Sequence, residues 1–302
     1  MAAELTPRLR CDDGAGLDPA LPNRSAPPAL GAYNARLPPF PKAKRTLTAY
    51  RGATMPAYDF RSPRLYVELA LAEGATLALD RAQAHYLGTV LRLGAGDPIL
   101  VFNGRDGEWT ATLVGQKRSI SLLVGARQRA QTLPADLHYL FAPLKAARLD
   151  YMVQKAVEMG AARLQPVITR RVQVARINGE RMRANAIEAA EQCGILSLPD
   201  IAEPAPLDRV MAERDPQRWL VFCDEDAEAA NPVAALAPLA HAAPTPLAVL
   251  VGPEGGFAAD ERAALLKLPK IVRLALGPRI LRADTAAVAA LALVQAVAGD
   301  WR

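Results

Sequence analysis

Two stretches near the C-terminus decide the fold expected of this chain. The first is Leu250-Val251-Gly252-Pro253-Glu254-Gly255-Gly256-Phe257, an apolar strand that runs into a glycine-rich loop and then into a helix. Ligands bind beyond the carboxyl ends of parallel strands, where glycines let the backbone approach them. The stretch therefore predicts a ligand site, with an ordinary strand-to-helix turn as the alternative. It is neither a P-loop nor a dinucleotide fingerprint, because the Gly-Lys-Ser/Thr ending and the G-x-G-x-x-G spacing are missing.

The second stretch is Leu276-Gly277-Pro278-Arg279-Ile280-Leu281-Arg282-Ala283-Asp284-Thr285-Ala286, which is again a strand end, a loop and a helix start. Arg279 and Arg282 are placed to reach an anion. Asp284 and Thr285 favour the start of a helix through capping and the helix dipole. We therefore expect this loop to supply charged groups to a ligand site. The alternative is that Asp284 is only a cap.

The chain around these stretches alternates strands with helices from residue 136 onward. This rhythm predicts an α/β domain with a mostly parallel sheet. The expected strands are Leu137–Phe141, Leu164–Thr169, Trp219–Cys223, Leu247–Val251 and Ile271–Ala275. The expected helices are Arg148–Met159, Glu180–Cys193, Ala259–Lys267 and Asp284–Val297.

The segment before residue 130 has a different pattern, in which short alternating strands are separated by turns. Residues 103–107, Asn-Gly-Arg-Asp-Gly, are typical of a hairpin, and one helix is expected with Asp80 as its N-cap. We expect a small β-barrel here, followed by a linker at residues 131–135. The expected strands are Leu65–Leu69, Ala75–Leu79, Pro98–Phe102, Glu108–Val114 and Ile120–Val124. The apolar face of the helix is expected to consist of Ala84, Leu87, Val90 and Leu91.

Residues 1–62 are rich in Pro, Ala, Gly and Arg without helical or strand periodicity, so we expect a disordered tail. The tail contains nine Lys or Arg against five Asp or Glu, whereas residues 63–302 contain 27 against 26. Overall basicity is therefore weak support for RNA binding by the folded part. Two interpretations of the tail stay open. It is a basic arm that contacts phosphates, or an extension upstream of a true start at Met55, which we favour because Met55 stands just before the first strand.

Composition narrows the class of protein. The chain has 302 residues and is 51% hydrophobic, which suffices for a sizeable core. No apolar run approaches the roughly 18 residues of a membrane span, and a signal peptide is not indicated, so we expect a cytoplasmic protein without membrane contact. Cys11, Cys193 and Cys223 fit neither a disulfide framework nor a zinc ribbon. His85, His138 and His241 form no metal constellation, and His138 is expected to be a core histidine, so no metal is expected.

Taken together, the two C-terminal stretches resemble the signature of the SPOUT methyltransferases, and among them of RsmE, the small-subunit (16S) ribosomal RNA uracil-N3 methyltransferase family. That family carries a Gly-Pro-Glu-Gly-Gly loop followed by Leu-Gly-x-Arg-Ile-Leu-Arg-x-Glu-Thr-Ala. Further matches are Lys145, Arg148, Gln154-Lys155-Ala156, Glu158 to Gly160, Ala190-Glu191-Gln192-Cys193-Gly194 and Pro199. The resemblance covers residues 64–299. Asp284 replaces the usual Glu, and Ile195 stands where an Arg is common, which would weaken one RNA contact.

The resemblance implies a SPOUT domain with a deep trefoil knot at residues 136–302 and a PUA-like RNA-binding barrel at residues 63–130, after the tail at residues 1–62. It implies S-adenosylmethionine as the cofactor, bent in the knot and contacted largely by backbone groups. It also implies a homodimer whose active site is completed across the interface. The substrate would be small-subunit ribosomal RNA, either naked or assembled in the 30S subunit. The matching cofactor positions are Val251, Gly252, Glu254, Gly255, Leu276, Gly277, Ile280 and Leu281.

Methyl transfer to a uracil ring nitrogen requires that donor and acceptor are aligned and that the N3 proton is removed. Arg282 is the candidate for stabilising a uracil oxygen or a flanking phosphate, because a guanidinium fork holds an oxygen at two points. Asp284 is the candidate base, or the group that orients Arg282. Candidates for RNA contacts are Lys145, Arg148, Lys155 and Arg92, with His85, Arg170 and Arg171 in the same class. The alternative for all of these is an ordinary solvated surface.

Three other functions stay open. A SPOUT enzyme that methylates a ribose 2′-hydroxyl would need a stronger base, because the hydroxyl is less acidic than the uracil imide. A non-catalytic RNA-binding or ribosome-assembly factor would be expected to have damaged cofactor loops, whereas both loops are intact. A nucleotide-dependent oxidoreductase is disfavoured by the missing dinucleotide fingerprint.

Overall fold

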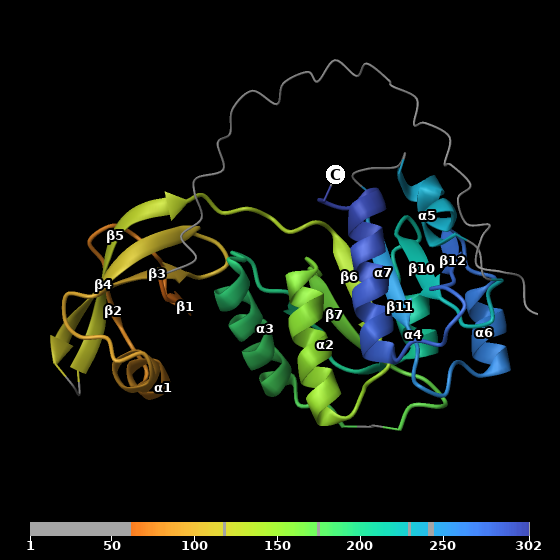
Figure 1. The fold of residues 1–302 in the computed structure, drawn as a ribbon, viewed down its shortest axis with the longest axis horizontal. Coiled ribbons are helices and arrows are strands. Elements are labelled where there is room, and N and C mark those ends of the chain that lie inside the picture. The colour runs from red at the N-terminus through yellow and green to blue at the C-terminus, as the bar shows by residue number, and fades with distance from the viewer. Residues whose placement is uncertain (1–61, 117–118, 174–175, 229–230, 241–244, 302) are drawn as a thin grey trace, which may run out of the picture. The chain divides into compact units, whose positions relative to one another are not determined.

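A computed structural model describes residues 62–116, 119–173, 176–228, 231–240 and 245–301. Its larger sheet has seven strands, and six of them are parallel neighbours in the order β12-β10-β11-β6-β7-β8 (Figure 1). Their bounds are β6 Leu137–Phe141, β7 Arg163–Ile168, β8 Asp200–Ile201, β10 Trp219–Cys223, β11 Leu247–Val251 and β12 Ile271–Leu274. The seventh strand, β9 (Ala205–Pro206), pairs with β7. The predicted parallel α/β sheet is therefore confirmed.

The sheet is apolar on both faces because helices cover both. All five residues of β11 are buried, as the uninterrupted apolar run in its sequence requires. On one face Val249 belongs to a core shared with α2 (Ala146–Glu158), α3 (Gly179–Cys193), α5 (Pro232–Ala240) and α7 (Ala283–Ala298). On the other face Leu250 packs in a core with α4 (Leu207–Ala212) and α6 (Ala259–Leu265). The carboxyl end of β11 is thus held in the interior of the sheet, between β10 and β6.

The last helix returns from the edge of the sheet to its centre. β12 is the edge strand beside β10, whereas α7, which follows it, contacts β11, α2 and α5 (Figure 1). Residues 275–282, which connect β12 to α7, line one pocket with the residues that follow β10 and β11. This is the return path that the predicted trefoil knot requires.

Four short elements were not expected from the sequence, namely α4, α5, β8 and β9. Pro238 lies inside α5, where a proline removes one backbone hydrogen bond. The helix nevertheless begins with Pro232, a favoured first position, and Asn231 Oδ1 accepts a hydrogen bond from Val233 N at 2.9 Å. It retains Pro238 because burial of Leu236 and Leu239 against α7 offsets the hydrogen bond that proline removes.

A second, smaller sheet lies earlier in the chain and has its own hydrophobic core (Figure 1). Its five strands are β1 Arg64–Tyr66, β2 Thr76–Ala78, β3 Pro98–Phe102, β4 Glu108–Gln116 and β5 Ser119–Arg129, in the order β1-β3-β4-β5-β2. The predicted hairpin at residues 103–107 is confirmed, because β3 and β4 are antiparallel. Asn103 Oδ1 stabilises this turn by accepting hydrogen bonds from the backbone N of Arg105 and Asp106, at 3.1 and 2.9 Å.

The helix of the smaller sheet is capped as predicted but continues differently. Asp80 caps α1 (Arg81–His85) in a capping box with Gln83, and the chain goes on as a π-helix, η1 (Tyr86–Val90). The wider π turn shifts the angular phase, so Leu87 is buried as expected but Val90 is 58% exposed. The expectation that Val90 belongs to the apolar face is therefore wrong. Arg92 lies beyond the helix in a left-handed conformation, with φ 58°, so the helix does not carry Arg92 and His85 together.

Two sequence expectations fall on residues that the structure does not describe, namely the tail up to residue 61 and His241. Among the described residues, no helix is long and apolar enough to cross a membrane. Contacts within the chain place the described residues in one compact unit.

His138 in β6 gives the stability a pH dependence. Burial lowers its pKa to about 4, and the nearby Arg218 guanidinium adds to the shift, from an ordinary value of 6.5. As the pH falls from 6.5 to 4, the unfolded chain therefore binds this proton before the folded chain does. We expect the free energy of unfolding to fall by roughly 1–3 kcal/mol across that window because of His138 alone. Urea unfolding of His138→Gln should show a flatter pH profile, with His85→Gln, an exposed position in α1, as the control. An unchanged slope in His138→Gln would contradict the assignment.

Candidate functional site

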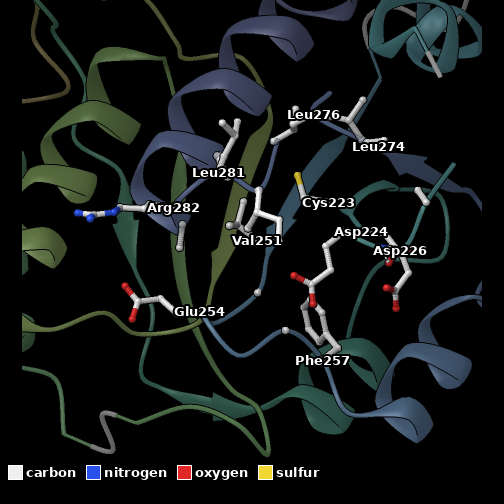
Figure 2. A pocket seen from close by; sticks show the side chains of 18 of the residues that line it. Cys223, Asp224, Asp226, Val251, Glu254, Phe257, Leu274, Leu276, Leu281 and Arg282 are labelled. Carbon is white, nitrogen blue, oxygen red and sulfur yellow. Dashed lines mark hydrogen bonds between the residues drawn. The ribbon is translucent and has the colours of Figure 1, made fainter. Parts of the chain in front are cut away.

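The loops that follow β10, β11 and β12 meet in one pocket of about 520 Å³ (Figure 2). Because these three strands are parallel neighbours, their carboxyl ends lie side by side at the same edge of the sheet. The pocket is lined by residues 223–227, 251–254, 256–257 and 274–283, with Arg148, Arg262 and Ala286. The two stretches that the sequence singled out therefore form one site.

Most of the predicted cofactor positions line this pocket. They are Val251, Gly252, Glu254, Leu276, Gly277, Ile280 and Leu281. Gly255 is not part of the lining, and its carbonyl instead accepts a hydrogen bond from Arg171 Nη1 at 2.8 Å. The structure thus assigns Gly255 to the outer side of the loop.

Two glycines of the first loop have no room for a side chain. A Cβ on Gly252 would overlap the ring of Phe257, which itself packs edge-on against Phe222 with ring centroids 5.1 Å apart. Gly256 has φ 67°, and a Cβ there would overlap the carboxylate of Glu225. The bare backbone of this loop is therefore what faces the pocket, as expected for a ligand held by main-chain groups.

The two candidate catalytic residues lie at the start of α7 but do not contact each other. Arg282 is the N-cap of α7 and lines the pocket with an exposed side chain. Asp284 is the second residue of the helix, half-buried and outside the lining, and its Oδ1 accepts from Thr285 N at 2.9 Å. Asp284 is therefore not the N-cap, although its charge favours the helix N-terminus. Among the described residues, no hydrogen bond joins it to Arg282.

The predicted RNA-binding residues do not form one cluster. Arg148 lines the pocket and forms an ion pair with Glu254, which joins α2 to the glycine loop. Lys145 is the exposed N-cap of α2, whereas Lys155 donates to both carboxylate oxygens of Glu158 at 2.7 and 2.8 Å. That pairing raises the pKa of Lys155 and neutralises its charge locally. Arg92 lies in the loop between η1 and β3.

Arg170 and Arg171, which the sequence also offered as RNA contacts, bind other parts of the chain. Arg170 forms an ion pair with Asp260, and its backbone N donates to Glu261 Oε1 at 2.9 Å. Arg171 holds the Gly255 carbonyl as described above. Both side chains therefore stabilise the glycine loop and the start of α6 in this structure.

Sequence reasoning missed the acidic loop after β10, which lines the pocket with Asp224, Glu225 and Asp226. Asp224 is buried and pairs with Arg262 at 3.0 Å and Arg273 at 2.8 Å. Burial alone would raise its pKa, but the hydrogen bonds from the two arginines lower it below its ordinary value. The sequence did show that these acidic residues follow a predicted strand. It did not show that this strand lies beside β11, because strand order is not visible in the sequence.

The pocket has two chemically different sides (Figure 2). Asp224 and Asp226 lie on one side, and Arg282 and Glu254 lie on the other, with the apolar side chain of Val251 between them and those of Leu276 and Leu281 above it in the view. Burial raises the pKa of Cys223, at the end of β10, to about 12, so its thiol is protonated and is not a nucleophile at neutral pH. No group of three or more potential metal-binding side chains occurs in the described part of the chain. The site can therefore hold a ligand by backbone and apolar contacts and present the exposed guanidinium groups of Arg279 and Arg282 to a second molecule.

Comparisons with known proteins identify the family. Residues 131–295 match an RNA methyltransferase domain, and residues 79–124 match an RNA methyltransferase PUA domain. The ribosomal RNA small subunit methyltransferase E of Rickettsia conorii is 30% identical over 235 residues, which cover 77% of this chain and 94% of that protein. This chain belongs to the ribosomal RNA small subunit methyltransferase E family.

Solved structures of the methyltransferase E family show the same fold. The enzyme from Neisseria gonorrhoeae, bound to S-adenosyl methionine, has a TM-score of 0.71 and 26% identity, and the match covers 80% of this chain and 100% of that one. A Legionella pneumophila protein described as a putative methyltransferase in complex with the same cofactor has a TM-score of 0.68 and 29% identity, covering 79% and 98%. The predicted fold class, a SPOUT domain preceded by a PUA-like domain, is confirmed.

Proposed function

We propose that this chain transfers a methyl group from S-adenosylmethionine to N3 of a uridine in 16S ribosomal RNA. The observation that carries the proposal is the pocket at the ends of β10, β11 and β12, built from a bare glycine loop and an arginine-bearing loop. Family members of the same fold bind S-adenosyl methionine, and a volume of about 520 Å³ suits a ligand of that size. The intact loops argue against a non-catalytic assembly factor.

The glycine loop and the second loop would hold the cofactor. S-adenosylmethionine, when bound, supplies an electrophilic methyl group on a sulfonium. The backbone at Gly252, Leu276 and Gly277 offers hydrogen-bonding groups, and the side chains of Val251, Ile280 and Leu281 offer apolar contact. Gly255 contributes only through the shape of the loop, because its carbonyl is held by Arg171. Glu254 forms an ion pair with Arg148, and both side chains line the pocket.

The residues of α7 would act on the uridine. The Arg282 guanidinium is exposed at the pocket wall and lies away from the acidic side, so an oxygen of the uracil ring or a phosphate can approach it. Asp284 is the candidate base for the N3 proton. Its half-buried carboxylate retains one oxygen that does not bond to Thr285.

We propose further that the working form is a cytoplasmic homodimer, with a PUA-like domain at residues 63–130 and a SPOUT domain at residues 136–302. Ile280, on the wall of the pocket, is 90% exposed, and Tyr151 on α2 is 46% exposed. A second subunit packed against this wall of the pocket would cover the Ile280 side chain. Lys145 and Arg92 would contact phosphates of the RNA.

The decisive experiment uses radiolabelled S-adenosylmethionine and small ribosomal subunits from cells that lack the enzyme. Label is expected on N3 of one uridine of the ribosomal RNA, and mapping identifies the nucleotide. Transfer to intact subunits but not to naked RNA would establish the substrate form. Absence of transfer would contradict the enzyme proposal, and label on a ribose would replace it by 2′-hydroxyl methylation. A chain that starts at Met55 in the same assay decides whether the tail contributes.

The variant Asp284→Asn tests the proposed base. If the carboxylate accepts the N3 proton, kcat is expected to fall by about 10²–10⁴-fold. Cofactor affinity should stay unchanged, because Asp284 does not line the pocket. Turnover should be compared with calorimetric binding of S-adenosylmethionine. Unchanged turnover would remove Asp284 from the mechanism and leave it as a residue that stabilises the helix N-terminus.

A further inference from the structure

The stretch Ala190-Glu191-Gln192-Cys193-Gly194 at the end of α3 has no place in the pocket, and the structure shows what it binds. Arg64 of β1 reaches across from the smaller sheet and donates to the carbonyl oxygens of this helix end. Its Nη1 donates to Ala190 O and, at 3.0 Å, to Glu191 O, and its Nη2 donates to Ile195 O at 3.0 Å. The last carbonyls of a helix lack partners within the helix and carry partial negative charge, so a guanidinium is well suited to them.

The charge of Arg64 is balanced within the same buried cluster. Its Nε donates to Glu108 Oε1 at 2.7 Å, and the Arg64 and Glu108 side chains are each 3% exposed. Arg129 of β5 holds Glu108 from the other side at 2.7 and 2.8 Å and donates to Gly194 O at 2.9 Å. Both arginines therefore bond the smaller sheet directly to the end of α3, and Glu108 of β4 holds their two guanidinium groups.

Apolar packing surrounds this cluster. Phe102 of β3 is fully buried in a small core with Ala190 and Leu196, and the Arg64 guanidinium lies over its ring at 4.4 Å from the centroid. Tyr66 N donates to Glu191 Oε1 at 2.8 Å beside it. A contact that combines buried charge, helix carbonyls and an aromatic core is rigid, in contrast to a surface ion pair.

We propose that Arg64 is a positioning residue for methyl transfer, which fixes the PUA-like sheet on the end of α3 so that RNA bound by the sheet meets the pocket in one orientation. This inference rests on the proposed function. The connection at residues 130–136 contains no helix or strand, and the Gln131 side chain hydrogen-bonds to residues 196–197. This connection would not fix the position of the two sheets by itself.

The variant Arg64→Met tests the proposal, because Glu108 keeps its pair with Arg129 and no isolated buried charge is left. We expect kcat/KM for small ribosomal subunits to fall by about 10²-fold, since a misplaced substrate loses its alignment with the methyl donor. The Kd for S-adenosylmethionine and the binding stoichiometry should stay within about twofold, because the pocket shares no residue with the cluster. Arg64→Lys keeps the positive charge but loses the forked guanidinium, so its kcat/KM should lie between those of the wild type and Arg64→Met. Arg209→Met, which removes an exposed arginine paired with Glu213, is the matched control.

The outcomes separate the two proposals. Unchanged kcat/KM in Arg64→Met, or an equal loss of cofactor binding, would show that Arg64 has no positioning role. If the wild-type chain itself transfers no methyl group, the proposed function fails instead. In that case, hydrogen exchange tests whether Arg64 holds β1 on the end of α3. Exchange of the peptide that contains β1 should be at least about tenfold faster in Arg64→Met if the cluster holds that strand. Unaltered exchange would overturn it.

Discussion

Replacing Arg282 by alanine is expected to lower kcat for methyl transfer by about 10²–10³-fold, the usual effect of removing one preorganised donor to a developing charge. Removal of the N3 proton leaves negative charge on the uracil oxygens, and Arg282 is the guanidinium at the N-terminus of α7 that lines the pocket. Its side chain is exposed, so the substitution removes no core packing. Single-turnover transfer to small ribosomal subunits measures the effect, and calorimetry should show S-adenosylmethionine binding within about threefold of wild type.

Two matched variants make the Arg282 experiment specific. Arg282→Lys keeps the charge but cannot hold an oxygen at two points, so its kcat should lie between those of alanine and arginine. Arg279→Ala removes another exposed arginine from the same loop and should cost less. An equal loss in Arg279→Ala would mean that the total charge of the loop, and not the position of Arg282, supports the reaction.

The variant Gly252→Ala is expected to weaken S-adenosylmethionine binding by about 10- to 10²-fold. The added Cβ would overlap the Phe257 ring, which cannot retreat because it packs against the fully buried Phe222. The loop has to shift instead, and overpacking of this kind typically costs about 1–3 kcal/mol, which corresponds to that range of affinity. Isothermal titration of the purified chain measures it without any RNA.

Gly179→Ala provides the control for the glycine experiment. Gly179 begins α3, and a Cβ there would meet nothing within 4 Å, so cofactor affinity should be unchanged. A wild-type affinity in Gly252→Ala would show that the bare backbone of the loop is not what the cofactor requires. The same result would also argue against this pocket as the cofactor site, because the loops that contain Gly252 and Gly277 form its walls.

Much of the fold was predictable because its determinants are short-range. The strands β3, β6, β10 and β11 have the predicted bounds, since each is an apolar run between turn signals. α5 was missed because Pro238 stands inside it, and a proline in a helix interior usually marks a break; packing of Leu236 and Leu239 against α7 compensates for it. Val90 was misplaced because a π turn, which has no clear sequence signal, changes the phase of the helix that carries it.

The candidate site divides in the same way. The glycines of residues 252–256 and the arginine at position 282 could be selected from sequence, because strand ends, bare loops and charge are properties of neighbouring residues. The acidic loop at residues 224–226 could not, since its place beside the pocket follows from the strand order β12-β10-β11. Asp284 was expected to cap a helix that in fact begins one residue before it.

By itself, the sequence determined the two kinds of sheet, the caps and turns such as Asp80 and Asn103, and the two loops that carry the chemistry. These features depend on contacts between residues a few positions apart, whose pattern is visible in one dimension. Only the tertiary structure decided that Arg148 meets Glu254, 106 positions away, and that Arg64 meets Ala190, 126 positions away. Such pairs have no local signature, because the free energy that brings them together comes from burial of the cores around them.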